Sequence, residues 1–204
     1  MKRTLAIIFA LIVWFAVVAQ YYMMLENRVT GILETTIRFF SFFTILTNSL
    51  VAIYFTDQAI SVTRSTRANN SGFLTAITIY ITIVGLVYQI LLRQIWEPQG
   101  LSMLVDELLH SVNPLLVICF WYLYENKSKI SYKQIPKWLV FPLVYLIFIL
   151  FRGSISQFYP YPFIDVSALG LSQVLINSAA LVLVFVVMSA LFVFTGRWLS
   201  KKSV

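Results

Sequence analysis

Long apolar stretches alternate with short polar connections along most of this chain. Six such stretches cover residues 4–24, 39–56, 72–92, 101–124, 136–151 and 171–195. Most of them reach the ~20 residues that a helix needs to cross a bilayer. The second and fifth are the shortest and depend on flanking residues for their length. The pattern predicts an all-α polytopic membrane protein, a bundle of six transmembrane helices that forms a single domain over residues 1–204.

Composition supports this class and removes several others. The chain is 60% hydrophobic and 11% charged, which is too apolar for a soluble domain with one core. Its first stretch begins like a signal peptide, but the apolar part is longer than a cleaved signal has, so we expect a retained helix. One cysteine and one histidine cannot form a disulfide or a zinc site within the chain. We therefore expect no metal and no organic cofactor.

The basic residues are distributed unequally between alternate connections. Sorting the Lys and Arg residues by side gives eleven on one side and four on the other, and the richer side is expected to be cytoplasmic. Both termini are then cytoplasmic. The basic residues flank helix ends, so they suit anionic lipid head groups and not nucleic acid. The eleven are Lys2, Arg3, Arg64, Arg67, Lys127, Lys129, Lys133, Lys137, Arg197, Lys201 and Lys202, and the four are Arg28, Arg38, Arg93 and Arg152.

Polar residues gather in the halves of the stretches that this orientation places toward the outside. Unpaired polar groups in hydrocarbon cost several kcal/mol each, so these side chains should face one another or a wet cavity. We infer a polar cavity in the outer half of the bundle. The residues concerned are Ser41, Thr44, Thr47, Asn48, Tyr88, Gln89, Arg93, Asp106, Glu107, His110, Asn113, Arg152, Gln173, Asn177 and Ser178.

His110 is the only histidine and lies inside an apolar stretch, where an ionisable group is a candidate functional residue. Asp106, His110 and Asn113 are spaced to share one helix face. Asp106 or Glu107 could fix the imidazole tautomer and make His110 a general base. The alternative is a histidine that only joins helices by hydrogen bonds. Pro114 cannot donate to the His110 carbonyl, which predicts a kink and a free carbonyl there.

Thr44 is the candidate nucleophile that such a base would activate. A threonine in a helix more often bonds to the carbonyl four residues earlier, and Thr47 has the same ambiguity. Asn48 could donate to an oxyanion or could only join two helices.

The candidate lipid-binding residues are Arg93, Arg152, Asn113, Asn177 and Tyr161. An arginine at a span end can bind a carboxylate or phosphate head group, or can extend to the interface without a specific partner. Tyr161 belongs to an aromatic, proline-rich loop at residues 159–163, which could cap the cavity or lie in an aromatic belt.

Three motifs resemble a bacterial group of small six-span proteins that is distantly similar to the eukaryotic androgen-induced and androgen-dependent membrane protein family. They are FFTILTN at 42–48, LLHSVNPLL at 108–116, and YPYPF at 159–163 followed by Asp165. The resemblance covers nearly the whole chain in span number and motif order. It implies a threonine hydrolase that cleaves fatty acid esters of hydroxy fatty acids within a bacterial plasma membrane, with Thr44 as nucleophile and His110 as base. The spacing from histidine to proline differs from that of the eukaryotic proteins.

The leading hypothesis is therefore an intramembrane lipid-ester hydrolase whose partners are a lipid or fatty-acid ester substrate and membrane lipids. The alternatives are a small transporter or proton relay through His110 and Asp106, and a non-catalytic lipid-binding protein. Apolar inner halves and the lack of a clear inverted repeat argue against transport.

Overall fold

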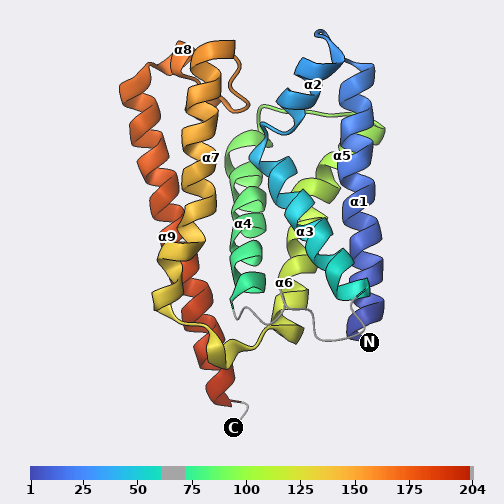
Figure 1. Ribbon diagram of the computed structural model, residues 1–204, viewed down its shortest axis with the longest axis vertical. Coiled ribbons are helices and arrows are strands. Elements are labelled where there is room, and N and C mark those ends of the chain that lie inside the picture. The colour runs from blue at the N-terminus through green and yellow to red at the C-terminus, as the bar shows by residue number, and fades with distance from the viewer. Residues whose placement is uncertain (61–71, 203–204) are drawn as a thin grey trace. The chain divides into compact units, whose positions relative to one another are not determined.

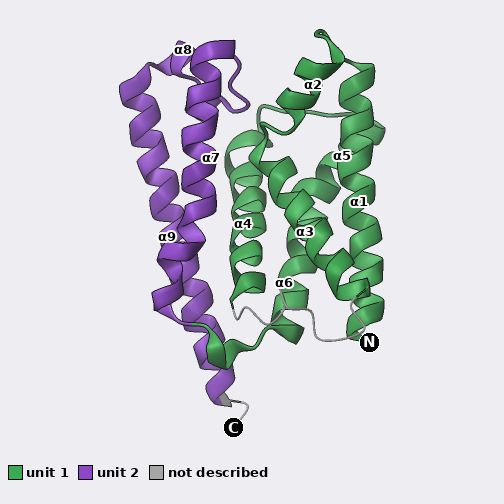
Figure 2. Cartoon of the chain, viewed as in Figure 1, with its two compact units in different colours: residues 1–130 green, residues 131–204 purple. Residues whose placement is uncertain are grey.

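The computed structural model describes residues 1–60 and 72–202, and within these ranges every regular element is helical. Arg64 and Arg67, which we assigned to the cytoplasmic side, lie outside the described residues. The chain forms two compact units, residues 1–130 and 131–204 (Figure 2). The expectation of a single domain over residues 1–204 stays a prediction.

The first unit is a bundle in which consecutive spans alternate in direction (Figure 1). α1 packs along α3, and α4 packs against α3 and α6. Wide π-helical turns continue α4 (η1, Tyr88–Leu92) and join α5 to α6 (η2, Leu108–Val112). The helices are α1 (Lys2–Glu26), α2 (Ile32–Phe39), α3 (Phe43–Ile60), α4 (Phe73–Val87), α5 (Leu101–Glu107) and α6 (Asn113–Tyr124).

Three aromatic rings join α1, α3 and α6 in the core of this unit. The ring centroid of Phe55 lies 5.4 Å from that of Phe9 and 5.0 Å from that of Phe120, and both pairs meet edge to face. Phe55 and Phe120 are fully buried. Such pairs contribute about 0.5–1.5 kcal/mol each beyond their buried area, so this cluster fixes how the three spans pack.

The basic end of the first unit is tied together by polar contacts. Arg3 Nε donates to the Ala59 carbonyl at 2.9 Å, and Glu125 accepts from the Thr75 amide and hydroxyl at 3.0 and 2.8 Å. Lys127 lies over the Trp121 ring, and burial lowers the pKa of its ammonium group, partly offset by Glu125. The ends of α1, α3, α4 and α6 that we assigned to one side therefore do lie together.

Five helical segments are long and apolar enough to cross a membrane among the described residues. The α2–α3 pair makes a sixth if its two helices, bent by 75°, are counted as one span. This confirms the prediction of an all-α polytopic protein and indicates an integral membrane protein. The five segments are Lys2–Glu26, Phe73–Leu92, Leu101–Tyr124, Tyr132–Ser156 and Leu171–Lys201.

The second apolar stretch is not one helix from residue 39 to 56 as expected, because the chain bends between α2 and α3. Ser41 Oγ donates to the Ile37 carbonyl at 2.7 Å, and the Ser41 and Phe42 amides bond three residues back. Side-chain bonding of this kind competes with helix continuation. The helical pattern resumes when the Leu46 amide donates to the Phe42 carbonyl at 3.1 Å.

The second unit is a helical hairpin of α7 (Ile135–Ser156) and α9 (Leu171–Lys202), with the short α8 (Val166–Leu169) in the connection. Asp165 caps α8 by accepting from the Ser167 amide and hydroxyl and from the Ala168 amide. These hydrogen bonds, chiefly that of the Ser167 hydroxyl, hold the pKa of Asp165 below its usual range. A Cβ on Gly153 would lie 2.0 Å from the Tyr159 ring, so the connection packs on α7 only because residue 153 is glycine.

Candidate active site

Thr44 and His110 lie side by side in the first unit although 66 residues separate them in sequence. Thr44 Oγ1 is 3.4 Å from His110 Nε2. The bend at residues 40–42 makes Thr44 the second residue of α3, and His110 lies within η2. Thr44 is 7% exposed and the His110 side chain 11%. The sequence predicted that the two residues lie at similar depth, and the structure brings them within reach of each other.

The other imidazole nitrogen determines the tautomer. His110 Nδ1 is 3.0 Å from the Asp106 carbonyl oxygen and 3.2 Å from Asp106 Oδ1. A carbonyl oxygen can only accept, so Nδ1 carries the proton and donates. In the neutral ring, Nε2 then has a free lone pair directed toward the Thr44 hydroxyl. This is the tautomer that a base acting on Thr44 requires.

The two neighbouring carboxylates have different partners. Asp106 contacts His110, whereas Glu107 forms an ion pair with Arg93 and accepts from Ser111 Oγ at 2.6 Å. Gln89 completes this second network, because it donates to Ser111 and accepts from Arg93, both at 2.8 Å. The sequence left Asp106 and Glu107 as alternatives for orienting His110, and the geometry selects Asp106.

Asn48 and Asn113 join the helices around this pair. Asn48 Nδ2 donates to the Thr44 carbonyl at 2.9 Å and to the Leu109 carbonyl at 3.3 Å. Asn113 Nδ2 donates to Asn48 Oδ1 at 2.8 Å, and both asparagines are fully buried. The amide of Asn48 therefore holds the backbone of Thr44 beside the residue that precedes His110. Its role as an oxyanion donor stays a prediction.

Two buried polar atoms in this region, Asn113 Oδ1 and Thr47 Oγ1, have no hydrogen-bond partner among the described residues. The Tyr88 hydroxyl lies within hydrogen-bond reach of the Asp106 carboxylate. Thr47, the alternative nucleophile, is fully buried. His110 Nε2 faces Thr44, so the geometry favours Thr44 over Thr47.

Pro114 is accommodated by a wide turn. In η2, the Asn113 amide bonds to the Leu108 carbonyl five residues back, which is the π-helical pattern. The His110 carbonyl, which we expected in a cavity, faces α4 instead: a Cβ built on Gly85 would lie 3.0 Å from it. The predicted kink is therefore a local widening of the helix against a glycine of its neighbour.

Tyr88 is a neighbour of His110 whose role sequence reasoning missed. Its ring lies on the imidazole with the two centroids 4.1 Å apart and the planes 13° from parallel. Tyr88 is 3% exposed and begins η1, the other wide turn. In the sequence it was only one of several polar residues at a span end.

Comparisons with known proteins do not bear on the family of this chain. No family model, curated protein or solved structure matches it. The resemblance to the six-span group therefore stays a prediction that depends on its three short motifs.

Three of the candidate lipid-binding residues belong to the second unit. Arg152 Nη1 donates to Ser156 Oγ at 3.2 Å and its guanidinium lies over the Phe158 ring. Asn177 Nδ2 donates to the Phe163 carbonyl at 2.9 Å, and Tyr161 stacks on Phe163 with centroids 5.2 Å apart. These contacts secure the connection between α7 and α9, and the proposed lipid contacts stay predictions.

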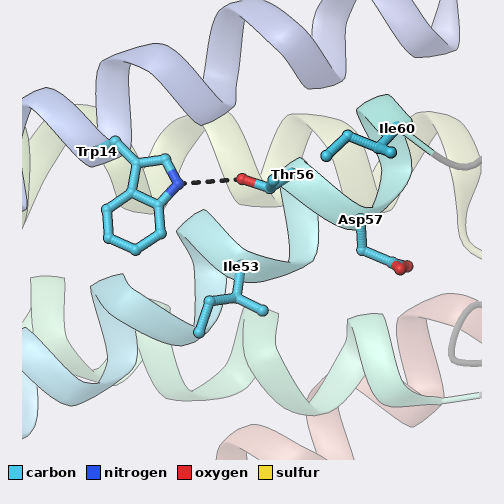
Figure 3. Close-up of a pocket in the computed structure, with 5 residues that line it drawn as sticks. All are labelled: Trp14, Ile53, Thr56, Asp57 and Ile60. Atoms are coloured by element: carbon cyan, nitrogen blue, oxygen red, sulfur yellow. Dashed lines mark hydrogen bonds between the residues drawn. The ribbon is translucent and has the colours of Figure 1, made fainter.

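A hollow of about 280 Å³ lies between α1 and α3 (Figure 3). Trp14 Nε1 donates to Thr56 Oγ1 across it at 3.0 Å, and Ile53, Asp57 and Ile60 complete its lining. Thr56 is twelve residues after Thr44, or ~18 Å along the helix, toward the basic end. This hollow is not the polar cavity that we predicted near His110, which stays a prediction.

Proposed function

We propose that this protein is an intramembrane hydrolase of lipid esters in which Thr44 is the nucleophile and His110 is the general base. The observation that carries the proposal is the 3.4 Å contact between Thr44 Oγ1 and His110 Nε2, in the tautomer that Asp106 imposes. Hydrogen bonds of catalytic groups are often long without substrate and shorten in its presence.

The reaction has two steps. Thr44 Oγ attacks the ester carbonyl carbon while His110 Nε2 accepts the hydroxyl proton. The tetrahedral intermediate then expels the alcohol, which takes that proton from His110, and the acyl group remains on Thr44. Water attacks this acyl-threonine with His110 again as the base, which releases the carboxylic acid and restores Thr44.

Charge formed in each step has a group nearby that stabilises it. The Asp106 carboxylate is 3.2 Å from Nδ1 and stabilises the imidazolium. Thr44 lies in the first turn of α3, where the positive end of the helix dipole favours an oxyanion. These contributions come from groups already in place, so little reorganisation is needed during the reaction.

The substrate class follows from the surroundings of the pair. Thr44 and His110 lie within apolar, membrane-spanning helices, so a long-chain ester reaches them more readily than a water-soluble one. Arg93 is the candidate for binding a lipid carboxylate, which would replace Glu107 as its partner. Esters of hydroxy fatty acids, which the resemblance implies, have both features.

A proton relay is the second candidate function, and one observation favours it. The Asp106 carboxylate is buried, its Oδ1 faces His110, and the Tyr88 hydroxyl lies within hydrogen-bond reach of the same carboxylate. Buried ionisable pairs of this kind occur along proton paths.

Labelling with a fluorophosphonate probe separates the two functions. The hydrolase should be labelled on Thr44 because His110 increases the nucleophilicity of that hydroxyl. The labelled residue is located by peptide mass spectrometry, with the Thr44→Ala variant as the control. Absence of labelling in a folded protein that dissipates a proton gradient in vesicles would support the relay and exclude the hydrolase.

We also propose that both termini are cytoplasmic and that the membrane is a bacterial plasma membrane. The excess of basic residues at one set of connections supports this orientation. A green fluorescent protein fused after Val204 should fluoresce, whereas alkaline phosphatase fused there should be inactive. The opposite result would place the Thr44–His110 pair nearer the cytoplasmic face.

A further inference from the structure

We propose that Tyr88 is a positioning residue that holds the His110 imidazole in its reactive orientation. This inference rests on the proposed hydrolase function for its effect on rate, but the orientation itself can be measured without any substrate. Tyr88 stacks on the imidazole, so it acts through the histidine.

The stack is produced by two wide turns that face each other. In η1 the Arg93 amide bonds to the Tyr88 carbonyl at 2.8 Å, and in η2 the Asn113 amide bonds to the Leu108 carbonyl. Both are bonds to the fifth residue back. π-helical turns are rare and occur frequently at functional sites. Here one such turn carries each member of the stacked pair.

Gly85 allows the two helices to come close enough for this stack. A Cβ built on Gly85 would lie 3.0 Å from the His110 carbonyl oxygen and 3.3 Å from Pro114 Cγ. Contacts that short are rare for a real side chain, so a larger residue would separate the helices. Tyr88 follows Gly85 by about one helical turn, and its ring centroid lies 4.1 Å from that of the His110 imidazole.

The imidazole needs such support because rotation about its Cβ–Cγ bond, the χ2 torsion, has a broad energy profile. The Nδ1 contacts with Asp106 fix one edge of the ring, and Tyr88 covers one face. Together they keep Nε2 directed at Thr44. The electron-rich face of Tyr88 also attracts the imidazolium formed when Thr44 loses its proton.

Tyr88 is in turn held in place by Arg93. The Arg93 guanidinium lies 6.0 Å from the Tyr88 ring centroid, and Arg93 is paired with Glu107 and bonded to Gln89. The Arg93 network thus supports the orientation of His110 through Tyr88. Its contribution to the site does not require that Arg93 bind the substrate.

The test compares Tyr88→Phe, which keeps an aromatic ring, with Tyr88→Leu, which removes it. Tyr80→Leu is the matched control, because Tyr80 is buried on the same helix eight residues earlier, ~12 Å away along α4. Two quantities are measured: the imidazole proton resonances and the rate of histidine modification by diethyl pyrocarbonate. Since the chain has one histidine, both report on His110 alone.

In the protein without substitutions, we expect the Tyr88 ring to shift the imidazole proton resonances of His110 upfield. Tyr88→Leu should remove that shift, speed modification of His110, and lower kcat by up to about 10²-fold with a smaller change in KM, as misplacement of a catalytic group does. Tyr88→Phe should keep the shift because it keeps the ring, and Tyr80→Leu should keep both the shift and most of kcat.

Each result decides a separate point. If the imidazole resonances are not shifted in the protein without substitutions, the stack of Tyr88 on His110 is wrong. This result does not depend on whether Tyr88→Leu folds. Removal of the shift without loss of kcat overturns the positioning role. A shift that depends on Tyr88 in a protein that hydrolyses no ester supports the positioning of His110 and contradicts the proposed function.

Discussion

Thr44→Ala should abolish ester hydrolysis by the purified protein. The variant lacks the oxygen that attacks the ester, and loss of a catalytic nucleophile lowers kcat by on the order of 10⁴-fold or more. Folding should persist because the change removes only small groups, and a lost hydrogen bond of this kind costs about 1 kcal/mol. Release of fatty acid from an ester substrate, measured by mass spectrometry, checks the prediction.

Thr47→Ala is the matched control for this experiment. It removes the same atoms from a buried threonine one turn later on α3, and it should retain most of the activity. Thr44→Ser keeps a hydroxyl at the same carbon and should retain part of it. If Thr47→Ala were the inactive variant, the nucleophile would be Thr47; if both alanine variants hydrolysed the ester normally, neither threonine would be catalytic.

His110→Gln should lower the hydrolysis rate by roughly 10²–10⁴-fold, the usual contribution of a general acid–base group. Glutamine can form a hydrogen bond with Thr44, but it cannot accept a proton near neutral pH. The imidazole must be neutral to act as a base, so the rate of the unmodified protein should fall in acid. The residual rate of the variant should lack that dependence.

Ser111→Ala is a suitable control for the histidine variant. Ser111 follows His110 in the same wide turn, but its hydroxyl bonds to Glu107 and Gln89. Its loss should leave the dependence on pH in place. A nearly normal rate for His110→Gln would show that the histidine only packs between helices and that the threonine–histidine mechanism is wrong.

Hydrophobicity alone was enough to predict the five unbroken spans found among the described residues. The stretch expected at 101–124 coincides with the observed span Leu101–Tyr124, because the whole segment is apolar on average. The bend at 40–42 could not be found in the same way. Phe40 and Phe42 keep the local average apolar, while the bend depends on hydrogen bonds of Ser41.

The candidate site was predictable only in part. Counting residues along two spans indicated that Thr44 and His110 could meet, and Thr44 Oγ1 is 3.4 Å from His110 Nε2. Their depth in the membrane stays a prediction.

Asp106 and Glu107 precede His110 by four and three residues on the same helical segment, so spacing alone allowed either to contact the imidazole. The contact of Glu107 with Arg93, on the span that contains η1, leaves Asp106 as the partner of His110. Tyr88 was missed because its stacking depends on two turns that ordinary helical periodicity does not describe.

The wide turn at residues 108–112 keeps one set of side chains along the span Leu101–Tyr124 directed into the bundle. Residues four apart in a straight α-helix drift by about 40° per step around the axis. Here five residues at that spacing are all buried: Val105, Leu109, Asn113, Val117 and Trp121. A drift of about 160° would have turned the last toward the opposite side, and the extra residue in the π turn removes part of it. A run of buried positions at strict four-residue intervals is thus a pattern by which such a turn can be sought in other membrane-spanning sequences.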